Sequence, residues 1–239
     1  MRADIGIIGA MVPEVEGLVA RLTDASSETI SGITFHSGTL LGKRVVIAQC
    51  GIGKVFAAVC CEIMILKYSP SLVVNTGVGG ALSQELKTGD IVIADKLCQR
   101  DMDTSPIGDP KGLISGINKI YFDTDPRARE ILTSAAERLG LHAMVGAIAT
   151  GDQFIASAED KNRILSDFPS VACEMEGGAV AHAAYINDTP FIVIRAISDS
   201  ADGEATMDYP TFLPLAARNS QNLTLALLSE WERDEKLEM

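Results

Sequence analysis

Short apolar runs alternate along the chain with segments of helical periodicity. Their length and their β-branched residues are typical of buried strands. The predicted strands are Ile5–Ala10, Ile33–Leu40, Arg44–Cys50, Leu72–Thr76, Ile91–Asp95, Val145–Thr150, Ser170–Cys173 and Phe191–Ile197. Leu41-Gly42-Lys43 predicts a hairpin between the second and third runs. Strands separated by helices indicate an α/β protein.

Several helices carry recognisable start signals. Pro13 and the pair Asp125-Pro126 fit first turns, because proline needs no backbone donor there and aspartate caps free N–H groups. Ser157 and Asp160 form a capping pair. Helical spacing or composition predicts three more helices: one with Val55, Val59, Ile63 and Leu66, one over Glu176–Tyr185, and a last one with Phe212, Leu215, Asn219, Leu223 and Leu227.

The chain is predicted to form one domain, residues 1–239, because it contains no polar or low-complexity linker and 47% of it is hydrophobic. The stretch from Cys98 to Lys119 has neither a strand nor a helix pattern and includes Pro106 and Pro110. A loop of this length in a compact domain is usually functional or takes part in an interaction.

Charge and hydropathy exclude two classes of partner. The formal net charge is −12 and no basic stripe is present, so nucleic acid, which is bound through clusters of Lys and Arg, is not expected. No apolar run approaches the roughly 18 residues that span a bilayer, and Ile5–Met11 lacks the features of a signal peptide. We expect a cytoplasmic protein with no membrane partner.

The cysteines and histidines do not predict a metal centre. The five cysteines form no C-x-x-C pair, and the three histidines are scattered. The cysteines are therefore interpreted as reduced and mostly buried. We expect no metal and no cofactor.

Five polar or glycine-rich clusters follow predicted strands. They are Glu14, Gly77-Val78-Gly79-Gly80, Gly151–Ile155, Glu174-Met175-Glu176 and Arg195–Asp199. Ligands of open α/β sheets bind beyond the carboxyl ends of the strands, so these clusters predict a pocket.

Each cluster also has a structural interpretation. The glycines are compatible with a tight turn, and Glu176 and Asp199 with helix caps or helix-dipole acids. Arg195 lies within an apolar strand, and a buried guanidinium needs an acidic partner. Glu14, Glu174 and Glu176 are the candidates.

Taken together, these motifs resemble the nucleoside phosphorylase and nucleosidase superfamily, and most closely the 5′-methylthioadenosine/S-adenosylhomocysteine nucleosidases. The resemblance covers nearly the whole chain. It rests on Ile5–Met11 with Glu14, Gly51–Val55, Asn75–Gly77, Gly151–Ile155, Glu174–Glu176 and Arg195–Asp199. It implies a single domain with a central twisted mixed β-sheet flanked by helices.

The resemblance also implies a role for each polar residue. Asp199 matches the acid that protonates N7 of adenine, oriented by Ser198. Glu176 matches the carboxylate that binds the ribose hydroxyls, with Met175 beside it. Glu14 matches the carboxylate that orients the attacking water, and Arg195 would hold Glu14 in place.

The apolar part of the pocket is implied in the same way. Phe154 matches the residue that stacks on the purine, and the backbone of Ile155 would bind its edge. Met11, Ile52 and Tyr209 would line the thioether side; the family usually has Phe where this chain has Tyr209. Val78 stands where better-known members have a serine that binds the water.

The resemblance further implies a homodimer in which a loop of each subunit closes the other's site. The matching loop is about Met102–Leu113, including Thr104 and Ile107. The expected ligands are an adenine thionucleoside and water, and the expected activity is hydrolysis of the N-glycosidic bond in methionine salvage.

Three other functions would share part of this pattern. A phosphorylase needs donors for phosphate, whereas Asn75-Thr76 and Glu14 offer no cationic site. A non-catalytic nucleotide-sensing module would share the sheet. It would not need both an acid beside the purine base and a carboxylate beside the attacking water. A nucleosidase for 6-amino-6-deoxyfutalosine or 5′-deoxyadenosine would use the same base end, and the sequence does not rank these 5′ groups.

Overall fold

The computed structural model describes residues 2–201 and 205–232, apart from the side chains of residues 206–208. Its strands are β1 (Ile5–Gly9), β2 (Thr23–Ile30), β3 (Ile33–Leu40), β4 (Lys43–Gln49), β5 (Leu72–Ala81), β6 (Ile91–Gln99), β7 (Tyr121–Asp123), β8 (Ala143–Thr150), β9 (Ala172–Glu174) and β10 (Phe191–Asp199). Its helices are α1 (Val12–Val19), α2 (Lys54–Tyr68), α3 (Pro126–Arg138), α4 (Ala158–Asp167), α5 (Gly177–Ile186), α6 (Ala205–Glu230) and the short η1 (Ser105–Ile107). Every predicted strand and helix is present, with shifts of a few residues at the ends.

The strands form one mixed sheet in the order β10-β6-β8-β9-β5-β1-β4-β3-β2, with β7 beside β6. β10 also pairs with β5, so the sheet closes on itself through β10, β6, β8, β9 and β5 and continues outward from β5 through β1. The predicted hairpin is confirmed by the antiparallel pairing of β3 and β4. Closure brings the ends of β5, β9 and β10 to one place.

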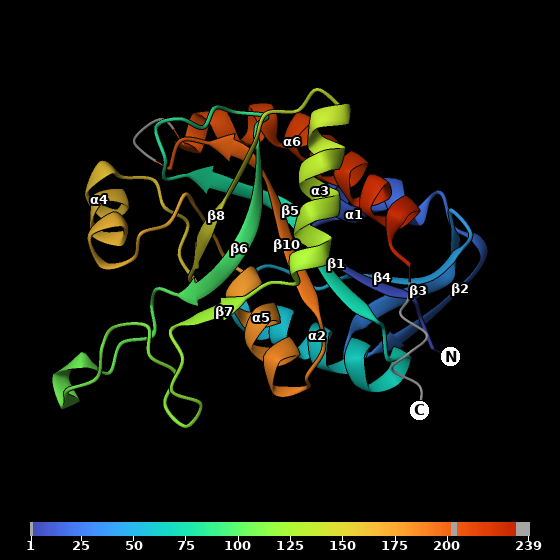
Figure 1. Cartoon of the computed structure of the whole chain (residues 1–239), viewed down its shortest axis with the longest axis horizontal. Coiled ribbons are helices and arrows are strands. Elements are labelled where there is room, and N and C mark those ends of the chain that lie inside the picture. The colour runs from blue at the N-terminus through green and yellow to red at the C-terminus, as the bar shows by residue number, and fades with distance from the viewer. Residues whose placement is uncertain (1, 202–204, 233–239) are drawn as a thin grey trace.

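Helices cover both faces of the sheet (Figure 1). α2 and α5 pack on one face through a cluster of small and apolar residues, and α1, α3 and α6 pack on the other. α4 belongs to a third, smaller cluster with Ile155, Phe168 and Leu82. Burial of these side chains is the main stabilising contribution to the fold.

Two predicted helix starts are confirmed by their capping bonds. Asp125 accepts a hydrogen bond from the backbone N–H of Ala128 at 2.8 Å. Ser157 accepts one from the N–H of Asp160 at 3.1 Å. In both cases the polar side chain satisfies an N–H group that the first helical turn leaves free.

The tight turn that the glycines at residues 77–80 are compatible with does not form, because β5 runs through these glycines to Ala81. The glycines are needed for close approach. A Cβ on Gly77 would lie 2.6 Å from Glu14 Oε1, and one on Gly80 would lie 2.9 Å from Asp199 Oδ1. The missing side chains leave room for two carboxylates beside the strand.

Two predicted apolar stripes face the core only in part. On α2, Val55 and Leu66 are 75% and 70% exposed, while α2 packs inward through other residues, which include Cys60 and Met64. On α6, Leu223 and Leu227 are buried, but Leu215 is 46% exposed. The α2 stripe thus leaves an apolar surface without a partner in the described part of one chain.

The predicted irregular stretch is confirmed between β6 and β7. It contains only η1 and a bridge between Ile114 and Lys119, and it projects from the body of the molecule (Figure 1). Among the described residues, no helix is long and apolar enough to cross a membrane.

Candidate active site

A cavity of about 340 Å³ opens where the ends of β5, β9 and β10 meet the start of α1. This volume lies in the range of small-molecule sites. Its lining is mainly apolar, with four carboxylates among the residues. The lining residues are Ala10, Met11, Glu14, Ile52, Val78, Gly79, Gly80, Gln153, Phe154, Ile155, Cys173, Glu174, Met175, Glu176, Ser198, Asp199 and Tyr209.

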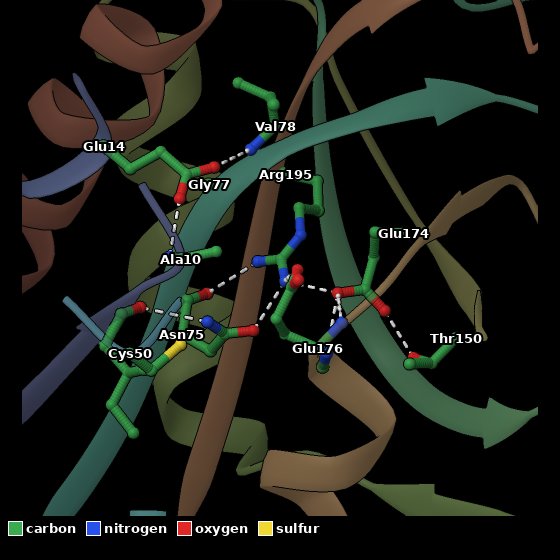
Figure 2. Close-up of polar contacts among 12 residues, drawn as sticks. Ala10, Glu14, Cys50, Asn75, Gly77, Val78, Thr150, Glu174, Glu176 and Arg195 are labelled. Atoms are coloured by element: carbon green, nitrogen blue, oxygen red, sulfur yellow. Dashed lines mark hydrogen bonds and ion pairs between the residues drawn. The ribbon is translucent and has the colours of Figure 1, made fainter. Parts of the chain in front are cut away.

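Glu14 lies in the first turn of α1 and is only 4% exposed. Its Oε2 accepts a hydrogen bond from the N–H group of Ala10 at 2.7 Å, and its Oε1 accepts one from Val78 at 3.0 Å (Figure 2). Oε2 also accepts a hydrogen bond from Met11 N–H at 2.9 Å. A carboxylate has about four acceptor positions, so one remains for a ligand. Burial raises the pKa of Glu14, although the charge of Arg195 and the three backbone bonds oppose the rise.

Arg195 lies in β10 and is fully enclosed. Its Nη2 donates to Glu174 and, at 2.6 Å, to Asn75 Oδ1, and it lies 3.8 Å from Glu176 Oε2. Among the described residues, no hydrogen bond or ion pair joins Arg195 to Glu14, the residue that it was predicted to hold in place. Arg195 acts on Glu14 through its charge, while backbone N–H groups fix that carboxylate (Figure 2).

Glu174 is the direct partner of Arg195, one of the three candidates that the sequence left open. It also accepts hydrogen bonds from Thr150 and from the N–H groups of Glu176 at 2.9 Å and Gly177 at 2.6 Å. Burial opposes its ionisation, but the charge of Arg195 and these bonds outweigh burial, and the pKa of Glu174 is lowered. Glu174 is thus a buried anion that binds the first N–H groups of α5.

Glu176 occupies the N-cap position of α5 but makes no capping bond with its side chain. Its Oε1 instead accepts a hydrogen bond from Gly53 N–H at 2.8 Å. Burial and the negative charge of Glu174 raise the pKa of Glu176 to about 7, although Arg195 and Gly53 oppose the rise. Because Glu174 takes over the capping bonds, the Glu176 side chain faces the cavity.

Asp199 ends β10, and among the described residues Ser198 and Ala201 orient its side chain. Ser198 Oγ donates to its Oδ2 at 2.8 Å, as predicted, and Ala201 N–H donates to its Oδ1 at 2.9 Å. Asp199 is 2% exposed and lines the cavity. It is therefore placed to exchange a proton with a ligand rather than with bulk water.

Aromatic and thioether side chains form part of the lining. The rings of Phe154 and Tyr209 meet edge to face at 5.5 Å between centroids, a favourable geometry for an aromatic pair. Tyr209 Oη lies 3.1 Å from Met11 Sδ. Ile155 is buried beside Phe154, and Ile52 and Met175 complete the lining. These side chains give the cavity an apolar and aromatic surface, as is usual for sites that bind small organic molecules.

Thr104 and Ile107 do not line this cavity. Ile107 is 82% exposed on the projecting loop, and Thr104 donates a hydrogen bond to Asp109 within the same loop at 2.8 Å. No cluster of three or more His, Cys, Asp or Glu residues that could hold a metal ion occurs among residues 2–201 and 205–232.

Comparison with known proteins places this fold and site in one class. A protein-family model described as the phosphorylase superfamily matches residues 4–229. The 5′-methylthioadenosine/S-adenosylhomocysteine nucleosidase of Actinobacillus succinogenes is 40% identical over 229 residues, which are 95% of this chain and 99% of that protein.

Solved structures agree with the sequence match. The nucleosidase of Neisseria meningitidis, in complex with methylthio-immucillin-A, superposes with a TM-score of 0.92 at 35% identity, covering 95% of this chain and 99% of that one. Futalosine hydrolase of Helicobacter pylori superposes with a TM-score of 0.91 at 34% identity, covering 95% and 97%. The chain therefore belongs to the 5′-methylthioadenosine/S-adenosylhomocysteine nucleosidases of the phosphorylase superfamily.

Proposed function

We propose that this protein hydrolyses the N-glycosidic bond of 5′-methylthioadenosine and S-adenosylhomocysteine, releasing adenine and the 5′-thio-ribose. The observation that carries the proposal is one mainly apolar cavity lined by the buried carboxylates of Glu14, Glu176 and Asp199. The 40% identity to a nucleosidase over almost its whole length supports the choice of substrates.

Asp199 is the general acid of this proposal. Adenine leaves poorly as an anion, so a carboxyl group that protonates N7 lowers the barrier, typically by a factor of ~10²–10⁴ in rate. The bonds from Ser198 and Ala201 fix the orientation of the Asp199 carboxyl. Phe154 would stack on the purine, and the backbone of Ile155 would bind its edge.

Glu176 binds the ribose hydroxyls while positive charge develops on the sugar. An oxocarbenium-like transition state is stabilised by a nearby carboxylate, and this effect is strong in a site shielded from water. Met175 and Ile52 would pack against the ribose and the thioether, together with Met11 and Tyr209.

Glu14 orients the attacking water with its remaining acceptor position. Its other positions are filled by backbone N–H groups, so its direction is fixed before the substrate binds. Val78 supplies one of these N–H groups, but its side chain offers no hydrogen bond to the water. Arg195 contributes through its charge and through Glu174.

Hydrolysis is favoured over phosphorolysis by the charge of the cavity. The guanidinium of Arg195 is already bound to Glu174 and Asn75, and several carboxylates would repel a phosphate ion in a site with little solvent to screen them. Product analysis tests this point: free 5-methylthioribose should form at the same rate without phosphate and with excess phosphate. A sugar 1-phosphate in the second sample would make the protein a transferase.

The general acid is tested with Asp199→Asn. An amide cannot deliver a proton to N7, so turnover should fall at least tenfold, while binding of 5′-methylthioadenosine changes little. Equal kcat values for variant and wild type would assign another role to Asp199. Wild-type enzyme should also cleave adenine nucleosides faster than inosine, whose 6-oxo group places an acceptor beside the carboxyl group.

The 5′ substituent is tested separately, because futalosine hydrolase of Helicobacter pylori is also a close structural relative. We expect 5′-methylthioadenosine to have the highest kcat/KM among three substrates, the others being 5′-deoxyadenosine and 6-amino-6-deoxyfutalosine. A higher value for the futalosine derivative would make that compound the preferred substrate without changing the reaction.

We further propose a homodimer. Val55, Phe56 and Leu66 form part of the exposed apolar surface of α2, and Ile107 exposes 82% of its side chain on the projecting loop. Large exposed apolar patches mark interaction sites, and Thr104 and Ile107 would close the partner's cavity. Light scattering should give twice the 25.4 kDa of one chain, and Val55→Asp should lower that mass. A fully active wild-type monomer would contradict a shared site.

We also propose a cytoplasmic location, which the sequence led us to expect. All five cysteines are free and buried, which fits a reducing compartment. Fractionation of source cells should recover the activity with the cytoplasmic enzymes, and recovery with secreted proteins would overturn this assignment.

A further inference from the structure

Lys161 is a cation on α4 that has no role in the mechanism proposed above. Its Nζ donates hydrogen bonds to the carbonyl oxygens of Ala81 and Ser200, both at 2.8 Å. Ala81 is the last residue of β5, and Ser200 follows the last residue of β10. One ammonium group therefore joins the ends of two strands that border the cavity.

The segment that Lys161 holds contains the proposed general acid. Asp199 precedes Ser200, and Ala201 follows it and donates its N–H to Asp199 Oδ1 at 2.9 Å. Ala201 has a φ of 49° and is completely buried. The left-handed conformation is unfavourable for a residue with a side chain and persists only where the surrounding structure imposes it.

The fit around this segment is close. A Cβ on Gly80 would lie 2.9 Å from both Asp199 Oδ1 and the Cβ of Ala201. Lys161 binds the carbonyl of the residue after Gly80 and the carbonyl between Asp199 and Ala201. These two bonds therefore hold the strained segment against β5 at the position where Ala201 N–H meets the carboxylate.

The same helix is joined to the part of the cavity that would hold the purine. α4 begins directly after its N-cap Ser157, and Ser157 follows the segment with Gln153, Phe154 and Ile155. Ile155 packs with Ile164 of α4 in one apolar cluster. Lys161 thus links the residues proposed to bind the base with the residue proposed to protonate it.

We propose that Lys161 is a positioning residue for Asp199: it fixes the distance and angle between the Asp199 carboxyl group and N7 of the bound purine. The inference rests on the proposed function, because it needs Asp199 to act at N7. It predicts that loss of Lys161 weakens the interaction with N7 specifically and leaves contacts with the sugar and the 5′ group unchanged.

Two inhibitors with a 5′-methylthio group separate these effects. Methylthio-immucillin-A carries a proton on N7 of its 9-deazaadenine and can donate it to Asp199. 5′-Methylthiotubercidin has a carbon in place of N7 and cannot make this bond. In Lys161→Met, the Kd of the first should rise about tenfold and that of the second less than about twofold, as expected for loss of one charge-assisted bond.

Arg163→Met is the matched control. Arg163 lies on the same helix, is exposed, and pairs with Asp160, so both Kd values should stay at wild-type levels. Lys161→Arg keeps donors for the two carbonyls, so the ratio of the two Kd values should stay close to the wild-type ratio. In Lys161→Met, kcat for 5′-methylthioadenosine should fall about tenfold with little change in KM. If Lys161→Met does not fold, Lys161→Leu, which also lacks a donor, serves for the same comparison.

An unchanged ratio of the two Kd values would overturn the inference, because a merely structural role weakens both inhibitors equally or neither. The proposed function fails differently. In that case the wild-type protein would cleave no adenine nucleoside and would show no preference for the inhibitor with the N7 proton, so the role of Lys161 would fall with it.

Discussion

Glu176→Gln should make the protein more stable above neutral pH while removing its activity. The glutamine has the same shape and can still accept the bond from Gly53 N–H, but it carries no charge. In the wild type, burial and the charge of Glu174 raise the pKa of Glu176 from 4.5 to about 7. The folded chain therefore binds the Glu176 proton more tightly than the unfolded chain does.

The sign of the effect follows from this difference in pKa. Glu176 contributes most to the free energy of unfolding below about pH 4.5, and this contribution is lost as the pH rises through about 7. A rise of this size corresponds to about 3 kcal/mol at 1.36 kcal/mol per pKa unit. Most of the loss, about 2.5 kcal/mol, falls between pH 5 and pH 8.

Urea unfolding at pH 5 and pH 8 measures the effect. The wild type loses stability over this interval through Glu176. The pKa of Glu14 is raised too, but Glu14 is present in both proteins, so the comparison isolates Glu176. The variant should lose about 2–3 kcal/mol less than the wild type. Glu174 does not interfere, because its pKa is lowered and it titrates below this interval. Equal losses in wild type and variant would refute the electrostatic account of Glu176.

Three further substitutions test the geometry. Arg195→Met leaves Glu174 buried without its cation and should cost about 3–5 kcal/mol of unfolding free energy in urea titrations; a loss below 1 kcal/mol would contradict the buried pair. Gly77→Ala places a Cβ 2.6 Å from Glu14 Oε1. In steady-state assays it should lower kcat at least tenfold, the scale of a lost catalytic group. An unchanged kcat would show that Glu14 can move. Val78→Thr adds a hydroxyl beside Glu14 without changing the shape of the side chain. It should raise kcat about two- to tenfold, the worth of one hydrogen bond, and Val78→Ala is the control. Equal kcat values in the two variants would mean that the water does not reach residue 78.

The sequence predicted which segments meet at the site, because strand ends in an α/β sheet converge at one edge. Ser198 and Asp199, and the clusters at Glu14 and Glu176, lie together as expected. What the sequence left open was the pairing inside the cluster. Arg195 had three candidate partners, and the choice of Glu174 depends on how β10, β5 and β9 align, which no local pattern encodes.

Local patterns also missed features whose cause lies elsewhere in the fold. β2 has no apolar alternation, since nearly all of its residues are exposed on an edge strand, and only its pairing with β3 makes it a strand. The glycines from Gly77 resemble a turn, but they are small because side chains from α1 and β10 approach the strand. The apolar stripe of α2 predicted the helix correctly but not the face that packs on the sheet. The residues of the stripe lie largely outward, and other apolar residues of α2 face the core.

The charge around Arg195 links the stability of the site to its proposed chemistry. Glu14, Glu174 and Glu176 all interact with this one buried guanidinium, so the cluster has more negative than positive groups. Arg195 hydrogen-bonds Glu174, and the pKa values of Glu14 and Glu176 are raised because burial penalises their charge. A ribose that develops positive charge supplies the missing counter-charge at the moment of reaction, so the cluster stabilises the transition state more than the ground state. A phosphate ion would add to the excess of negative charge. The buried carboxylates that lower the stability of the folded protein therefore also favour hydrolysis over phosphorolysis.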